Sequence, residues 1–348
     1  MVIVFAILLF SLLIFVHELG HYVAAKLSGV QVNEFAIFMG PAIVKWKRGE
    51  TQYSIRCIPI GGYCAMEGED EDTENPRSFQ KAAWWKRLII LVAGSFMNFV
   101  AGILLVAIVV APMNKVPVPV IGRANEGCTI VREGGLQVGD RFLEVDGEAI
   151  YVSSDVRMLL ALKESTTHDL VVERNGQKLV FNDYEMQQHQ FDDGVSYGIH
   201  FRQEEGTFLN KLAYTWNRCI DDVRTVRLSL QMLLTGRAGI QDMTGPVGIV
   251  QTMSDVAGQS TNLPQTLLTL LNFGAFIAIN LAVMNLLPIP AVDGGRVFGL
   301  LITTVIEKIT RKKVNPKYEG YIHAAGLILL LGLMAVIMFK DIFFIIKR

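Results

Sequence analysis

The sequence HELGH at residues 17 to 21 combines two imidazoles and a carboxylate in a pattern that can bind a metal ion. On an α-helix, residues four apart lie on the same face, so His17 and His21 would point to one side with Glu18 beside them. A catalytic zinc site usually has three protein ligands and a fourth position open for water. The motif therefore predicts a third ligand elsewhere, and it predicts that Glu18 acts as a base on a metal-bound water.

The surroundings of this motif are apolar. Residues 2 to 16, which precede it, carry no charge at all. A five-residue match of this kind also occurs by chance in soluble helices, where the polar residues form a solvated face. Ionisable groups inside a membrane are costly and tend to mark function, so the apolar setting strengthens the metal-site interpretation.

Asp293 is the candidate for the third ligand. It lies in NLLPIPAVDGG, residues 285 to 295, whose prolines and glycines must interrupt a helix. Non-helical backbone at membrane depth is tolerated only where it is buried in protein or lines a water-filled cavity. At ~1.5 Å per residue, His17 and Asp293 reach a similar depth near the cytoplasmic side. The alternative is that Asp293 is a turn residue outside the bilayer.

The composition predicts a membrane protein. Of the 348 residues, 51% are hydrophobic and 19% are charged. Four uncharged runs, at residues 2–16, 88–113, 267–291 and 324–339, suit a hydrocarbon core of ~30 Å. The first run could instead be a cleaved signal peptide. No basic region precedes it, however, and cleavage would remove the HELGH motif. We expect four transmembrane helices.

The basic residues predict the orientation of these helices. Lysine and arginine gather in the connections between the first and second runs and between the third and fourth, which should therefore be cytoplasmic. They are Lys26, Lys81, Lys86, Arg87, Lys308, Arg311, Lys312, Lys313 and Lys317. The N-terminus, the C-terminus and the region from about 114 to 260 would then be extracytoplasmic, although Lys347 and Arg348 oppose this. A net charge of −1 gives no indication of a nucleic-acid partner.

The pattern along the chain predicts four regions. Residues 1–113 form a first membrane part with a hairpin at about 32–66, 114–205 an extracytoplasmic β-rich domain, 206–262 a helical linker, and 263–348 a second membrane part. In the β-rich region, Asn175-Gly176 predicts a two-residue hairpin turn. Residues 135–150, GLQVGDRFLEVDGEAI, resemble the PDZ domain pattern. PDZ domains bind extended peptides and their C-termini at a sheet edge; an ordinary small β-domain is the alternative.

HELGH in the first run together with NLLPIPAVDGG in the third resembles the site-2 protease family of intramembrane zinc metalloproteases, specifically its bacterial PDZ-containing branch of the regulator of sigma-E protease type. The segments at 40–66, LVAGSFMNFVAGI and MTGPVGIV are also similar to this family. Val292 departs from the usual leucine, and Ser95 from a frequent proline. The resemblance implies an α-helical polytopic membrane protein with four transmembrane helices, a membrane-associated β-hairpin and an inserted α+β PDZ-like domain.

The resemblance also implies the site and its activity. His17, His21 and Asp293 would bind Zn²⁺, Glu18 would be the catalytic base, and Asn285 would hold the substrate backbone. The protein would hydrolyse peptide bonds in or near the transmembrane segments of single-span proteins, such as anti-sigma factors or remnant signal peptides, in the bacterial plasma membrane. A catalytically inert membrane scaffold bearing a PDZ-like domain is the alternative. A zinc transporter fits less well, because it would need further ligands along a path across the bilayer.

A transmembrane substrate must be unwound before its peptide carbonyls can reach a metal. The segment from Val44 to Tyr53 alternates apolar and polar residues and could offer a strand edge for this purpose, or it could be purely structural.

The remaining histidines and the cysteines give weaker signals. His168, His189 and His200 lack metal-ligand spacing and predict surface or packed positions. His323, at the start of the fourth run, predicts a place at the membrane interface. The four cysteines form no C-x-x-C pair, and pairing of Cys128 with Cys219 is left open.

Overall fold

The apolar runs form long helices in the computed structural model, which describes residues 2–69, 73–163, 165–191, 194–239, 241–258, 262–312 and 316–347. Lys313 and Arg348, which contributed to the predicted orientation, lie outside these ranges. The chain divides into two units: Met1–Leu105 with Val226–Arg348, and Val106–Thr225. We describe the two units separately.

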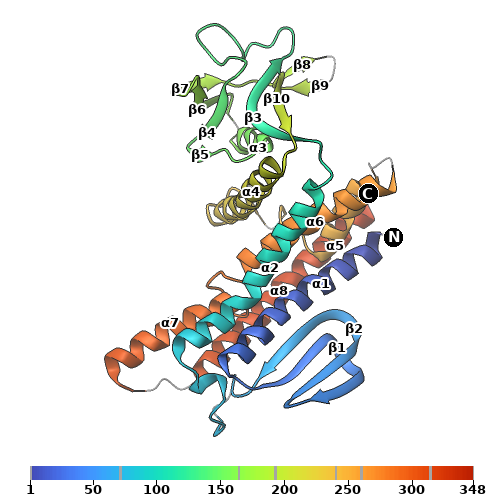
Figure 1. Ribbon diagram of the computed structural model, residues 1–348, viewed down its shortest axis with the longest axis vertical. Coiled ribbons are helices and arrows are strands. Elements are labelled where there is room, and N and C mark those ends of the chain that lie inside the picture. The colour runs from blue at the N-terminus through green and yellow to red at the C-terminus, as the bar shows by residue number, and fades with distance from the viewer. Residues whose placement is uncertain are drawn as a thin grey trace. The chain divides into compact units, whose positions relative to one another are not determined.

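In the described residues, four helices are long and apolar enough to cross a membrane, as predicted. They are α1 (Val2–Ser28), α2 (Trp84–Val110), α6 (Leu263–Met284) and the Gly320–Phe343 part of α8 (Pro316–Lys347) (Figure 1). The predicted limits need correction. The second helix begins at Trp84 rather than at residue 88, and the third ends at Met284 rather than at residue 291, because Pro288 and Pro290 cannot continue it.

The first unit contains two further helices. The short α5 spans Pro246–Gly258, within the region predicted as a helical linker, whereas α7, which spans Asp293–Thr310, was not predicted because these residues were treated as the connection to the last membrane run. The apolar residues of α7 recur at helical spacing, so the sequence carried this signal. A short 3₁₀ turn, η1 (Phe79–Lys81), precedes α2.

Glycines allow the helices of the first unit to approach closely. A Cβ atom on Gly20 of α1 would collide with the carbonyl oxygen of Ala93 in α2, and one on Gly274 of α6 would lie 2.9 Å from the Leu9 side chain of α1. Small residues at such contacts are typical of helices packed in a membrane. The buried core between α1, α5 and α6 consists of Ala6, Leu9, Leu13, Met253, Ala257, Leu270, Ile277 and Ala278.

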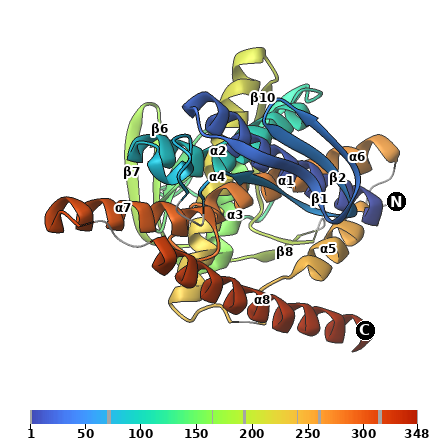
Figure 2. The same cartoon turned by 90° about the horizontal axis from the view of Figure 1, so that it is seen from below.

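The predicted hairpin is confirmed as strands β1 (Val32–Arg48) and β2 (Thr51–Met66), which lie beside α1 (Figure 2). Each strand bends, so that the hairpin folds back on itself. Phe35 pairs with both Tyr53 and Cys64, while Tyr53 also pairs with Trp46. The four segments therefore lie in the order 42–48, 51–56, 32–37 and 62–66. The outer edges are the segments 42–48 and 62–66.

Charged side chains anchor the hairpin. Glu50 at its turn accepts hydrogen bonds from Arg77 and from Lys26 at the end of α1, and these bonds lower the pKa of Glu50 to about 2. Burial opposes ionisation of Glu34, but hydrogen bonds from Arg56 and Ser54 lower its pKa to about 2. Large apolar side chains are nevertheless exposed on this hairpin, namely Met39, Ile43, Val44, Trp46 and Ile58.

The second unit is built on an antiparallel sheet, in agreement with the β-rich region that its composition predicted. The strands are β3 (Lys115–Ala124), β4 (Arg141–Val145), β5 (Glu148–Ala149), β6 (Thr167–Arg174), β7 (Gln177–Glu185) and β10 (Ile199–Glu205). Their order is β10-β3-β4-β6-β7, with β5 beside β4. Strands β8 (His189–Phe191) and β9 (Gly194–Ser196) form a separate ladder, and α3 (Ser153–Leu162) packs against β3 and β4. Asn175 and Gly176 have positive φ angles between β6 and β7, which confirms the predicted turn.

Helix α4 (Phe208–Leu234) confirms the predicted helix after the sheet and carries a buried cation. The Arg224 guanidinium donates to Asp221 at 2.5 Å and lies 3.0 Å from a carboxylate oxygen of Asp155. Burial and the neighbouring Asp155 raise the pKa of Asp221 to about 7. Cys128 and Cys219 are both free, so the structure contains no disulfide between them.

Candidate active site

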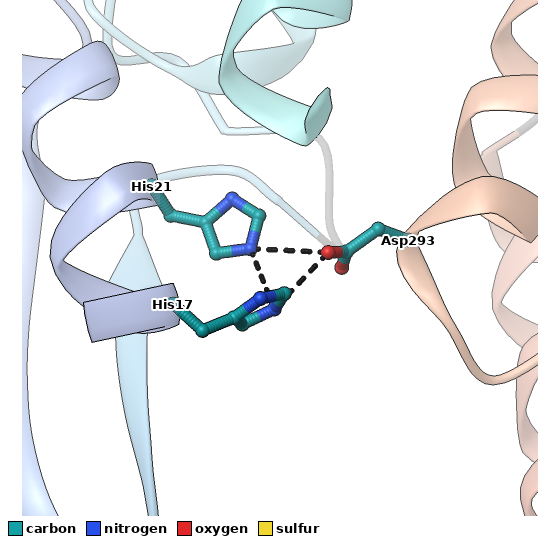
Figure 3. Close-up of side chains that lie close together, drawn as sticks. All are labelled: His17, His21 and Asp293. Carbon is teal, nitrogen blue, oxygen red and sulfur yellow. Dashed lines mark hydrogen bonds and ion pairs between the residues drawn. The ribbon is translucent and has the colours of Figure 1, made fainter. Parts of the chain in front are cut away.

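The structure brings together His17, His21 and Asp293, whose side chains point toward one another from α1 and from the start of α7 (Figure 3). Nε2 of His17 lies 3.1 Å from Oδ2 of Asp293, and Nε2 of His21 lies 3.3 Å from the same oxygen. The two Nε2 atoms are 3.2 Å apart. Three potential ligand atoms thus lie within 4.8 Å of one another. This is the group of residues that could hold a metal ion.

A backbone carbonyl fixes the tautomer of His21. Nδ1 of this residue lies 2.8 Å from the carbonyl oxygen of Ile90 in α2. A carbonyl oxygen can only accept, so Nδ1 carries the proton and donates it. In the neutral imidazole, Nε2 then presents a lone pair to the other two ligand atoms.

Gly94 of α2 makes room for both imidazoles. A Cβ atom at this position would collide with Nε2 of His21 and would lie 2.7 Å from Cε1 of His17. Real Cβ atoms do not approach other atoms so closely, so any larger residue would displace at least one ring. The helix α2 therefore forms a wall of the site at a position where it has no side chain.

The segment before Asp293 is non-helical, as its prolines and glycines predicted, and it is tightly held. The amide of Gly294 donates to the carbonyl of Asn285 at 2.6 Å, and Gly295 donates to Val292 at 3.0 Å. A Cβ atom on Gly294 would collide with the backbone of residues 286 and 287. The two glycines thus allow the segment to pack against the first turn of α7. This packing fixes the position of Asp293, the first residue of that helix.

A second contact supports this segment from α8. Ala291 adopts a φ of 84°, a left-handed conformation that is strained for a residue with a Cβ atom. Its amide donates to Nδ1 of His323 at 3.2 Å. The sequence predicted an interfacial position for His323. The structure shows that its ring contacts the segment that carries Asp293, and its position relative to a membrane interface stays a prediction.

A cavity of about 310 Å³ lies over the three ligand atoms. Glu18 lines it together with the outer strand segment of the hairpin and the first turn of α7; the lining residues are His17, Glu18, His21, Tyr63, Cys64, Ala65, Met66, Glu69, Leu91, Asp293 and Arg296. Glu69 and Arg296 form an ion pair there. The cavity gives Glu18 and a reacting peptide access to the same space.

The donor set fits zinc. Two imidazole nitrogens and one carboxylate oxygen are common ligands of catalytic Zn²⁺. Oδ2 of Asp293 is buried and has no hydrogen-bond partner. It faces the lone pair of His21 Nε2, an arrangement of electron-rich atoms that a cation between them would stabilise.

Asn285, predicted from the resemblance to hold substrate, ends α6 as its C-terminal cap. Its carbonyl supports Gly294, and Asn285 is not one of the residues that line the cavity in the described part of the chain. A role in substrate binding remains a prediction. Neither Tyr63 nor Arg296 was predicted as a cavity residue, because only the fold brings the hairpin to the start of α7.

In the described part of the chain, the metal-ligand group includes none of the other histidines. His168 is buried in the second unit with Nδ1 2.7 Å from a carboxylate oxygen of Asp146, and His200 lies 2.7 Å from Asn125. The prediction of surface or packed histidines is confirmed for these two residues.

The sequence model of peptidase family M50 matches residues 5–333. The chain belongs to peptidase family M50, the site-2 protease family. A protein of Clostridium perfringens, described by its name as a candidate zinc metalloprotease, is 37% identical over 355 residues, with 99% of each chain covered. Zinc metalloprotease RasP of Bacillus licheniformis is 28% identical over 420 residues, with 97% of each chain covered. Regulator of sigma-W protease RasP of Bacillus subtilis is 27% identical over 424 residues, again with 97% of each chain covered.

Membership of the site-2 protease family makes the protein a zinc metalloendopeptidase, and Zn²⁺ is its expected cofactor. Together with four helices that can cross a membrane, it also makes the chain a multi-pass membrane protein. The predicted family, enzyme class and cofactor are confirmed.

Proposed function

We propose that this site-2 protease family member hydrolyses peptide bonds in or near the transmembrane segments of single-span proteins, with His17, His21 and Asp293 as zinc ligands and Glu18 as the base. The observation that carries the proposal is the convergence of the three ligand atoms within 4.8 Å. Two of them come from α1, a helix that can span a membrane. The third comes from Asp293, which follows the non-helical segment after α6.

The residues of the chain would divide the work as follows. Bound zinc would supply Lewis acidity, polarising the scissile carbonyl and making water a better nucleophile. Glu18 would accept a proton from the attacking water and return it to the leaving amine, so that one carboxylate acts first as base and then as acid. Gly94 and Ile90 would hold the imidazoles in place. Asn285 remains our candidate for contact with the substrate backbone.

The orientation is part of the proposal. The basic connections support a site toward the cytoplasmic side of a bacterial plasma membrane, with both termini and the second unit extracytoplasmic. The name of RasP from Bacillus subtilis connects that protein with sigma-W regulation. This supports anti-sigma factors as substrates for the present chain, alongside remnant signal peptides.

The second unit would act as a PDZ-like domain. Its sheet carries one α-helix between β5 and β6, and the turn after β4 is formed by Asp146 and Gly147, both with positive φ. Such a domain would bind peptide C-termini by adding a strand to the sheet. Titrating the full chain with a fluorescent peptide that has a free C-terminus tests this part; an amidated peptide that binds equally well would contradict it.

The substrate would be held as a strand on residues 62–66 of the hairpin. This outer segment lines the cavity through residues 63–66, and Glu18 lies against it, since a Cβ atom on Gly62 would be 3.6 Å from Cγ of Glu18. The segment from Val44 to Tyr53, which the sequence suggested, is less suitable. Residues 51–56 are paired on both sides, and 42–48 form the opposite edge.

A proline scan tests this strand-pairing hypothesis. Proline removes an amide donor, so substitution at 63, 64 and 65 in turn should lower cleavage at least tenfold wherever the amide faces outward. The matched scan at 43, 44 and 45 of the opposite edge should change cleavage little. Initial rates on a single-span peptide in proteoliposomes provide the measurement. Equal effects at both edges would contradict pairing at residues 62–66.

Metal removal tests the activity itself. The purified protein should contain about one zinc per chain, and a strong chelator should abolish cleavage of a labelled single-span peptide. Stoichiometric Zn²⁺ should restore the rate, whereas Mg²⁺ should not, because Mg²⁺ prefers oxygen ligands. The assay is gel separation of the products with metal analysis of the same sample. Stoichiometric zinc with no cleavage of any membrane peptide would favour an inert scaffold.

A further inference from the structure

Asn98 is a buried polar residue next to the metal-ligand group that the proposed mechanism does not use. It lies on α2, one turn after Gly94, and is 1% exposed. Its amide nitrogen Nδ2 lies 3.3 Å from Nδ1 of His17. Its amide oxygen Oδ1 is buried without any hydrogen-bond partner. A buried carbonyl oxygen without a donor is costly and calls for an explanation.

The tautomer that His17 needs for metal binding explains the buried amide oxygen of Asn98. Its Nε2 faces Asp293 and His21, so Nε2 is the atom that would bind zinc. A neutral imidazole that binds a metal through Nε2 must carry its proton on Nδ1. With Nδ2 facing it, Nδ1 can only accept, and the proton would be on Nε2, where it would block the metal. With Oδ1 facing it, Nδ1 can donate and Nε2 is free.

We propose that Asn98 is a positioning residue of the metal centre: in the zinc-loaded protein its Oδ1 accepts a hydrogen bond from Nδ1–H of His17, which keeps Nε2 of His17 free for the metal. The proposal rests on the proposed function, since it takes His17 as a ligand. Rotation of the amide by about 180° exchanges its two polar atoms. Either orientation satisfies only one of them, so the need for a lone pair on Nε2 decides between the two.

Both histidines would then have the same kind of hydrogen-bond partner. His21 donates Nδ1–H to the Ile90 carbonyl, and His17 would donate Nδ1–H to the Asn98 amide, both on α2. A partner of this kind orients a ligating imidazole and strengthens metal binding, typically by 10- to 100-fold. Thus α2 contributes no ligand but supports both rings.

Zinc affinity of three full-length variants tests the proposal. Asn98→Asp keeps an acceptor, so its zinc affinity should be no more than a fewfold weaker than that of the wild type. Asn98→Leu has similar size but no acceptor, and its zinc dissociation constant should rise about 10- to 100-fold. Ser95→Ala serves as the matched control. It removes a buried hydroxyl of α2 that, like the amide oxygen of Asn98, has no hydrogen-bond partner, and no change in zinc affinity is expected. The measurement is competition with a chromophoric chelator in detergent.

Cobalt substitution gives a second readout that does not depend on activity. The visible absorption of bound Co²⁺ should be retained in Asn98→Asp and weakened or shifted in Asn98→Leu. Wild-type affinity in Asn98→Leu would overturn the proposal, and so would weaker binding in Asn98→Asp than in Asn98→Leu, because the amide would then act as a donor. A wild-type protein that binds no zinc would overturn the metal centre itself, which distinguishes failure of the proposed function from failure of the Asn98 role.

Discussion

Replacing Glu18 by glutamine should abolish turnover while leaving zinc bound. Glutamine matches the size of glutamate but cannot accept a proton at neutral pH, so the attacking water and the leaving amine both lose their proton carrier. General acid–base groups contribute about 10²- to 10⁴-fold to rate, and one that acts twice should lie at the upper end. We expect at least a thousandfold fall in kcat, with metal content unchanged.

The readouts are product formation from a single-span peptide and zinc content of the same preparation. Glu205→Gln is the matched control, because Glu205 is an exposed carboxylate of β10 in the second unit and should keep full activity. Activity of Glu18→Gln within tenfold of the wild type would contradict the assigned base. Loss of zinc together with activity would mean that Glu18 supports the metal rather than the proton transfer.

Replacing Gly94 by alanine should remove both zinc and activity, although the substitution adds only one methyl group. The added carbon would overlap with His21 and lie 2.7 Å from His17. Neither ring can retreat without losing its place beside Asp293, and His21 is also held by Ile90. Overpacking typically costs about 1–3 kcal/mol, and here the strain falls on two ligands at once. We expect at least a hundredfold rise in the zinc dissociation constant and a comparable loss of turnover.

Gly332→Ala is the control for this prediction. It lies on α8, where an added Cβ would have nothing within 4 Å, so the same change should leave zinc affinity and turnover unaltered. Thermal unfolding of both variants separates a local effect on the site from general destabilisation. Stoichiometric, tight zinc binding in Gly94→Ala would show that the helices move apart more easily than their packing suggests.

Much of the site could be predicted because its residue types are rare in their surroundings. His17, Glu18 and His21 stood out as ionisable groups in an apolar run, and Asp293 stood out after two prolines that interrupt a helix. The four membrane-spanning candidates and the Asn175-Gly176 turn followed from local pattern alone. In each case a few neighbouring residues contained the whole signal.

What could not be predicted depends on contacts between distant segments. Asn98 is an ordinary polar residue in the sequence, and its importance arises only where α2 passes His17. In the sequence, Gly94 has the pattern of a tolerated helix glycine, and residues 62–66 have that of a strand with no special edge. The hairpin folds back on itself at the bend formed by Phe38 and Gly40, which have positive φ angles. The alternation of apolar and polar residues does not predict which strand segments lie at the outer edges.

Asp293 is far from the two histidines along the chain, and this has a consequence for biosynthesis. Ribosomes deliver the N-terminal helix first, so a growing polypeptide carries HELGH in the membrane long before the third proposed ligand has been translated. A half-made chain would then be a latent enzyme, unable to damage neighbouring proteins during insertion. Completion of the last third of the molecule would switch it on, and premature termination products would be harmless.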